Sequence, residues 1–95
     1  MKEVLRILTL IDTLRNEGNA FVKECNCNNA FIRYTSAINY CDNHSKMGSI
    51  CYSNRAFCLI KMGKTTEALE DCILAVSLDD KNIKAETTKK KHDGY

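Results

Sequence analysis

The chain has 95 residues, of which 44% are hydrophobic and 27% are charged, and its formal net charge is +2 at pH 7. A chain of this length makes one small domain with much of its surface in water. The weak net charge does not favour nucleic acid or an anionic membrane as a partner. No apolar run reaches the roughly 18 residues that a membrane span needs.

Six cysteines raise the question of disulfides or a metal site. Residues 1–14 are amphipathic, unlike a secretory leader, so we expect a reducing cytoplasmic environment and free thiols. Cys25-x-Cys27 and Cys41-x2-His44 superficially suit zinc. About twelve helical residues separate the two pairs, roughly 18 Å, which is too far for one tetrahedral site. We expect no metal and no cofactor, and small buried hydrophobes at Cys51, Cys58 and Cys72.

Apolar spacing predicts helices and no strand in the first half of the chain. A first helix is expected over about Lys2 to Glu24, followed by a small and polar break at Cys25 to Asn29. A second helix is expected over about Ala30 to Cys41. Asn28 or Asn29 can cap it, because a short side-chain oxygen accepts from free backbone N–H groups.

The second half repeats this organisation. A third helix is expected over about Lys46 to Met62, ended by Gly63 because glycine adopts positive φ without steric cost. Thr65 or Thr66 is expected to cap a fourth helix that runs to about Leu78, and Asp79 or Asp80 is expected to open a fifth. The predicted buried stripe of the fourth helix is Ala68, Leu69, Cys72, Ile73, Ala75 and Val76.

The chain nearly repeats itself after 38 residues. Small and aromatic residues recur in the same order: Ala30, Tyr34 and Ala37, then Ala68, Cys72 and Ala75. Upstream, Gly18 and Phe21 match Ala56 and Leu59. A period of this size is typical of helical repeat proteins, which usually bind other proteins.

These residues resemble the tetratricopeptide repeat (TPR) family, which implies an all-α superhelix of helix–turn–helix units. The match runs through the segments 14–21, 30–37, 52–56 and 68–75. It implies repeats at 11–44 and 49–82, an extension of the first helix at 1–10, and a partial third repeat or capping helix with a basic tail at 83–95. Four inserted residues, Ser45 to Gly48, stretch the usual period of about 34.

A narrower resemblance is to the carboxylate-clamp TPR domains of co-chaperones. Those domains hold the C-terminal Glu-Glu-Val-Asp tail of the cytosolic seventy- and ninety-kilodalton heat-shock chaperones. The resemblance places Arg15 at the first clamp lysine, Asn19 and Asn54 at the clamp asparagines, and Lys84 at the lysine that opens the third repeat. The fifth clamp position, an arginine in the family, is Thr88 here, so one cationic contact is missing.

The residue chemistry is consistent with such a site. A terminal carboxylate needs converging donors, and Arg15 and Asn19 lie four residues apart on one helix face. Asn54 is expected on the next helix along the same wall. Taken singly, each of these residues also suits a solvated helix face or a local hydrogen bond. The remaining groove wall is expected to consist of Lys23, Phe57, Ile60 and Lys61.

A structural scaffold is the alternative function. Two repeats and one thin helix are few for a solenoid, and the fourth helix needs a cover. Either the fifth helix is sufficient, or the apolar stripe of Val4, Leu5, Leu8 and Ile11 pairs with another chain, including a second copy. The chain also suits one module of a longer protein. Catalysis is not expected, since neither histidine has a partner nearby in sequence and there is no Gly-rich phosphate loop.

Overall fold

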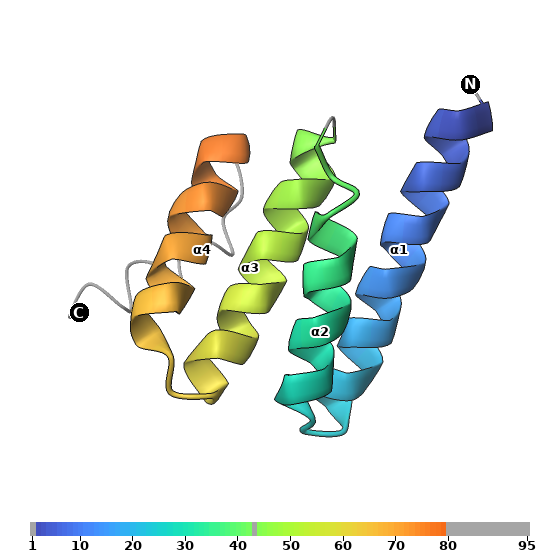
Figure 1. Cartoon of the computed structure of the whole chain (residues 1–95). Helices are drawn as coiled ribbons and strands as arrows, with labels where there is room; N and C mark the ends of the chain where they lie inside the picture. The colour runs from blue at the N-terminus through green and yellow to red at the C-terminus, as the bar shows by residue number, and fades with distance from the viewer. Residues whose placement is uncertain (1, 43, 80–95) are drawn as a thin grey trace.

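The computed structural model describes residues 2–42 and 44–79. These residues form four α-helices and no strand: α1 (Lys2–Lys23), α2 (Cys27–Ile38), α3 (Ser45–Lys61) and α4 (Thr65–Leu78). The helices lie side by side in chain order as two antiparallel hairpins (Figure 1). The all-α prediction of two stacked helix–turn–helix units is confirmed. The predicted fifth helix lies outside the described residues.

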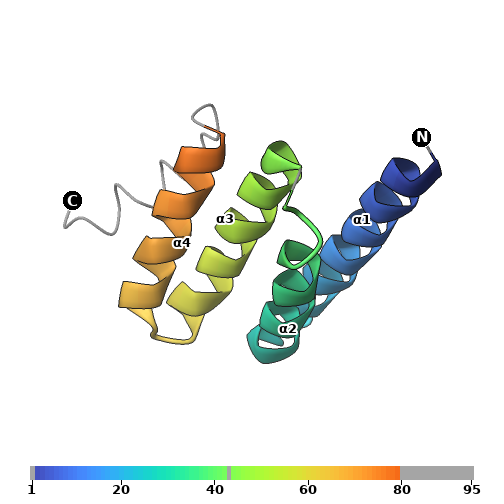
Figure 2. The same ribbon diagram turned by 45° about the horizontal axis from the view of Figure 1, so that its top comes forward.

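Packing between neighbouring helices follows chain order. α1 packs on α2, α2 on α3 and α3 on α4, and α1 also touches α3. Figure 2, turned by 45°, shows α2 close to α1 and α3 close to α4. Because α1 contacts α3, the first helices of the two hairpins together form one wall of the molecule.

Both hairpins turn in the same way. In the first, Cys25 has φ of 59°, and the N–H groups of Cys25 and Asn26 donate to Val22 (3.0 Å) and Phe21 (2.8 Å). In the second hairpin the equivalent residue, Gly63, has φ of 78°. Its hydrogen bonds repeat the pattern, as Gly63 donates to Ile60 (3.0 Å) and Lys64 to Leu59 (2.8 Å). This pair of backbone hydrogen bonds ends a helix at a residue with left-handed backbone conformation, as predicted for Gly63.

The helix caps differ from those predicted. α2 begins at Cys27 and ends at Ile38, three residues earlier at each end than expected. Its cap is Asn26, whose Oδ1 accepts from the backbone N–H of Asn29 at 3.2 Å, so the assignment to Asn28 or Asn29 is wrong. Because the chain turns tightly at Cys25, α2 begins, and is capped, earlier than predicted. The prediction for α4 is also wrong, because Thr65 already lies within the helix and Lys64 occupies the cap position without a side-chain hydrogen bond.

The core is built from small residues and a few large ones. One cluster joins α1 to α2 and α3 through Ile11, Ala37, Cys41 and Cys51. A second surrounds the ring of Tyr34, and a third joins α3 to α4 around Ala56 and Cys72. Burial of the predicted hydrophobic thiols is confirmed: Cys51, Cys58 and Cys72.

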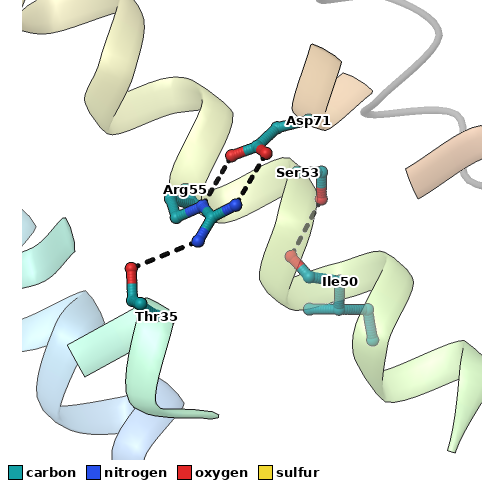
Figure 3. Close-up of polar contacts among 5 residues, drawn as sticks. All are labelled: Thr35, Ile50, Ser53, Arg55 and Asp71. Atoms are coloured by element: carbon teal, nitrogen blue, oxygen red, sulfur yellow. Dashed lines mark hydrogen bonds and ion pairs between the residues drawn. The ribbon is translucent and has the colours of Figure 1, made fainter. Parts of the chain in front are cut away.

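Two apolar stripes lie differently from the predictions. On α4, Ile73 is 48% exposed, whereas Asp71 is buried. The helix rotates about 100° per residue, so these residues point in nearly opposite directions. Asp71 is buried because it accepts from Arg55 (Figure 3). On α1, Val4 and Leu5 are exposed but Ile11 is fully buried, so the expected docking stripe is shorter than predicted.

Candidate functional site

A hollow of about 650 Å³ lies between the two hairpins. Its walls come from α1, α2 and α3, and it is lined by Asn16, Asn19, Ala20, Val22, Lys23, Tyr34, Asn54 and Phe57. Four of the eight predicted site residues are in this set: Asn19, Lys23, Asn54 and Phe57. Among the described residues no carboxylate lines the hollow, and Lys23 gives that lining a positive formal charge.

Asn19 is held by a hydrogen bond that the sequence alone did not reveal. The Tyr34 hydroxyl donates to Oδ1 of Asn19 at 2.6 Å. Burial raises the pKa of Tyr34 to about 12, so the phenol remains a donor throughout the physiological range. Because this bond uses the amide oxygen of Asn19, its NH₂ group is the part left to donate to a ligand.

Gly18 permits this arrangement. A Cβ atom on Gly18 would lie 2.5 Å from Cε1 of Tyr34, far inside van der Waals contact. The glycine therefore lets the phenol ring of α2 approach the backbone of α1 closely enough to reach Asn19. Sequence comparison of the repeats identified Gly18 as a small residue, but not the ring that requires it.

Asn54 supplies the facing wall. It lies on α3 and is 7% exposed, and it borders the same hollow as Asn19 although the two residues are far apart in sequence. Two carboxamides from different hairpins therefore meet at one concavity. That convergence depends on the packing of α1 against α3.

Arg15 lies near Tyr34 but does not line the hollow. Its Nη2 donates to Oδ1 of Asp12 at 2.6 Å, and its Nε is buried without a hydrogen-bond partner in the described structure. The guanidinium is nevertheless close enough for its charge to lower the pKa of Tyr34, against the larger effect of burial. Arg15 is thus a neighbouring cation, one helical turn from Asn19.

A second hollow, of about 810 Å³, adjoins the first and shares Val22 and Phe57 with it. Lys61 lines this second hollow, with its Nζ 5.4 Å from the centroid of the Phe57 ring. Ile60 borders neither hollow. Six residues after Asn54, it is rotated by about 120° from it around α3. Lys84 and Thr88 lie outside the described residues.

Solved structures reveal the fold class. The structure is similar to the second TPR of Spaghetti (RPAP3) bound to the HSP90 peptide SRMEEVD, with a TM-score of 0.86 and 25% sequence identity. The match covers 98% of this chain and 82% of that one. The chain has a TPR-like fold. No model of a known protein family matches it.

Several curated proteins resemble the TPR-like chain in sequence. It is 42% identical over 71 residues to human "Mitochondrial import receptor subunit TOM34" and 39% identical over 71 residues to human "DnaJ homolog subfamily C member 7". It is 38% identical over 76 residues to rat "Sperm-associated antigen 1". These matches cover 75%, 75% and 80% of this chain, but only 22%, 14% and 8% of the respective relatives.

Residues 2–42 and 44–79 contain neither a metal-binding cluster nor a helix that could span a membrane. No three His, Cys, Asp or Glu side chains gather there into a group that could hold a metal ion. None of the four described helices combines the length and the apolar character needed to cross a bilayer.

Proposed function

We propose that this TPR-like chain binds the acidic C-terminal tail of a heat-shock chaperone of the seventy- or ninety-kilodalton class, as a co-chaperone adaptor. The proposal rests on the meeting of Asn19, Asn54 and Lys23 at one hollow, which no carboxylate of residues 2–42 and 44–79 lines. The similarity to a TPR bound to the HSP90 peptide SRMEEVD supports it. Binding such a tail implies a cytoplasmic location.

The proposed binding mode assigns each residue one role. The amide NH₂ groups of Asn19 and Asn54 donate to the terminal carboxylate, and Arg15 and Lys23 supply positive charge beside it. Hydrogen bonds to a charged acceptor contribute about 1.5–3 kcal/mol each. Phe57 offers an apolar surface for the valine side chain that precedes the last residue. Lys84 is the proposed partner of the aspartate side chain.

Calorimetric titration with Ser-Arg-Met-Glu-Glu-Val-Asp tests this binding mode. The free acid is expected to bind at least about tenfold more tightly than its C-terminal amide, because the amide lacks the charged acceptor. Asn19→Ala is expected to remove most of this difference. Asn29→Ala, an exposed asparagine on the first turn of α2, is the matched control and leaves it unchanged. Equal, weak binding of acid and amide contradicts the proposal.

A scaffold contact through α1 is the second candidate. Leu5 is 67% exposed and lines a shallow apolar surface with Thr9 and Leu10 on the outer side of α1. We expect a contact there to produce a concentration-dependent increase in sedimentation coefficient, abolished by Leu5→Glu. A strictly monomeric profile at high concentration argues against this candidate.

A further inference from the structure

The groove continues past the proposed carboxylate site towards the hairpin turns. The second hollow is lined by Val22, Cys25, Asn26, Cys27, Asn28, Phe57, Lys61, Met62 and Lys64. Because Val22 and Phe57 line both hollows, an extended peptide can pass from the first into the second along a continuous surface.

The second hollow is electropositive. Lys61 and Lys64 line it, as do Asn26 and Asn28, whereas no carboxylate of the described residues does. Because α1 and α3 end at this hollow while α2 and α4 begin there, the helix dipoles largely offset one another, and the two lysines supply the positive charge. The apolar part of the lining comes from Val22, Phe57 and Met62.

Both lysines are available to an external anion. Each is exposed, and neither forms an ion pair with a carboxylate of the described residues. Lys64 also borders a separate, smaller hollow that contains Glu67, Glu70 and Asp71. Asp71 is already held by Arg55.

The spacing along α3 defines which part of a peptide reaches these cations. Lys61 follows Asn54 by seven residues, about 10 Å along the helix. An extended peptide advances about 3.3 Å per residue. With its terminal carboxylate at Asn54, the residue about three positions earlier lies opposite Lys61. Lys64 lines the same hollow beyond the end of α3, so we expect it to reach the one or two residues before that.

We propose that the second hollow binds acidic side chains about three to five positions before the C-terminal residue of the bound tail. This inference rests on the proposed function, since the carboxylate site sets the register of the peptide. Lys61 and Lys64 pair with the carboxylates, while Val22, Phe57 and Met62 contact the aliphatic parts of the peptide. The chain therefore prefers tails whose acidic run extends upstream of the last four residues.

Two synthetic peptides test the preference on the full 95-residue chain. One is Ser-Ser-Asp-Asp-Glu-Glu-Val-Asp, and the other is Ser-Ser-Asn-Asn-Gln-Glu-Val-Asp, which is neutral at the three positions concerned. At low salt the acidic peptide is expected to bind about tenfold more tightly, because two exposed ion pairs each strengthen binding by roughly a few fold. The preference is expected to shrink as salt screens the charges.

Lysine variants separate a local contact from overall charge. Lys61→Gln with Lys64→Gln is expected to reduce the preference to less than about twofold, and to weaken binding of the neutral peptide no more than the control variant does. The control is Lys2→Gln with Lys46→Gln, which removes the same charge at the opposite end of α1 and α3. This control variant is expected to retain the preference for the acidic peptide.

The outcomes distinguish this inference from the proposed function. Equal binding of the two peptides to the unmodified chain overturns the inference, as does a preference that survives loss of Lys61 and Lys64. In either case, tighter binding of a free acid than of its amide leaves the carboxylate site standing. Failure of both peptides to bind overturns the two proposals together.

Discussion

The two hairpins contain the same ion pair with its charges exchanged. Glu17 of α1 pairs with Arg33 of α2 at 3.3 Å. The equivalent residues, 38 positions later, are Arg55 of α3 and Asp71 of α4, which pair at 2.7 Å. The first pair is about half exposed, whereas the side chains of the second are 19% and 5% exposed. Equivalent positions thus hold the same interaction in two environments.

The buried pair also joins the hairpins. Arg55 donates two hydrogen bonds to Asp71, at 2.7 and 2.8 Å, and one to Thr35 of α2 at 3.3 Å (Figure 3). Its guanidinium also lies 5.5 Å from the ring centroid of Phe31 and 5.3 Å from that of Tyr52. The exposed pair thus joins the two helices of its own hairpin, whereas the buried pair joins α3 to α4 and, through Thr35, one repeat to the next.

Breaking the buried pair is expected to give the largest effect. Asp71→Ala leaves Arg55 buried without its partner and should lower the free energy of unfolding by about 3–5 kcal/mol. Glu17→Ala, the matched change in the first hairpin, should cost less than about 1 kcal/mol because the pair is half exposed. Urea unfolding followed by circular dichroism measures both. Equal losses contradict the distinction between the two environments.

Alkaline pH is expected to destabilise the first hairpin through Tyr34, whose equivalent in the second is Cys72. Burial raises the pKa of Tyr34 from 10.0 to about 12 in the folded protein. The unfolded chain therefore loses this proton first, and stability that is fully present below pH 10 falls as pH rises to about 12. The loss amounts to about 3 kcal/mol.

Urea unfolding between pH 9.5 and 11.5 measures this loss. Tyr34→Phe is expected to reduce the decline without abolishing it, because phenylalanine has no proton to release, while burial also raises the pKa of the Cys51 thiol to about 12. The variant is also expected to be less stable at neutral pH by about 1 kcal/mol, since the hydrogen bond to Asn19 is lost. An identical decline in the variant and the unmodified chain rules out Tyr34 as its source.

Gly18 and its equivalent Ala56 provide a third comparison. Gly18→Ala should lower stability by about 1–3 kcal/mol, because the new methyl group overlaps the Tyr34 ring. In the second hairpin, Ala56 packs in one cluster with the smaller Cys72 and causes no such conflict. Thermal unfolding of the variant measures the loss. In a Tyr34→Cys background the same substitution should cost less, and an undiminished cost contradicts the steric explanation.

The smallest expected effect is at the hairpin turns. Cys25 adopts the left-handed conformation that Gly63 adopts in the second hairpin, at a steric cost of about 1 kcal/mol. Cys25→Gly should therefore raise the free energy of unfolding by about 0.5–1 kcal/mol, with the gain reduced by the greater entropy of the unfolded chain. Gly63→Ala should lower it by a similar amount. A loss of stability in Cys25→Gly contradicts this explanation of the turn.

The sequence predicted the helices well because their signals are local. Apolar spacing and the glycine at position 63 gave the limits of α1, α3 and α4 to within one residue. The start of α2 was misplaced because three asparagines, Asn26, Asn28 and Asn29, are equally able to cap. Only the backbone turn at Cys25 selects Asn26.

The candidate site was predicted in part. Four of the residues that repeat register grouped together, Asn19, Lys23, Asn54 and Phe57, line one hollow, and their role in binding stays a prediction. It did not reveal that Tyr34 orients Asn19, that Arg15 contacts Asp12, or that Lys64 joins Lys61 in a second hollow. Each of those contacts depends on how far a helix is rotated about its own axis. A rotation too small to alter the apolar periodicity of a helix still changes which polar atoms come into contact.

The sequence by itself determined the number of hairpins, their order and their 38-residue repeat, because periodicity and turn residues act within a few positions of one another. The tertiary structure decided which polar groups are buried together. The sequence does not distinguish the pair Glu17 and Arg33 from the pair Arg55 and Asp71. Only the second pair is largely removed from water, and only its arginine also bonds to the other hairpin, at Thr35. Burial depends on neighbours that are distant in the chain, so the strength and role of these contacts emerge only when the helices pack.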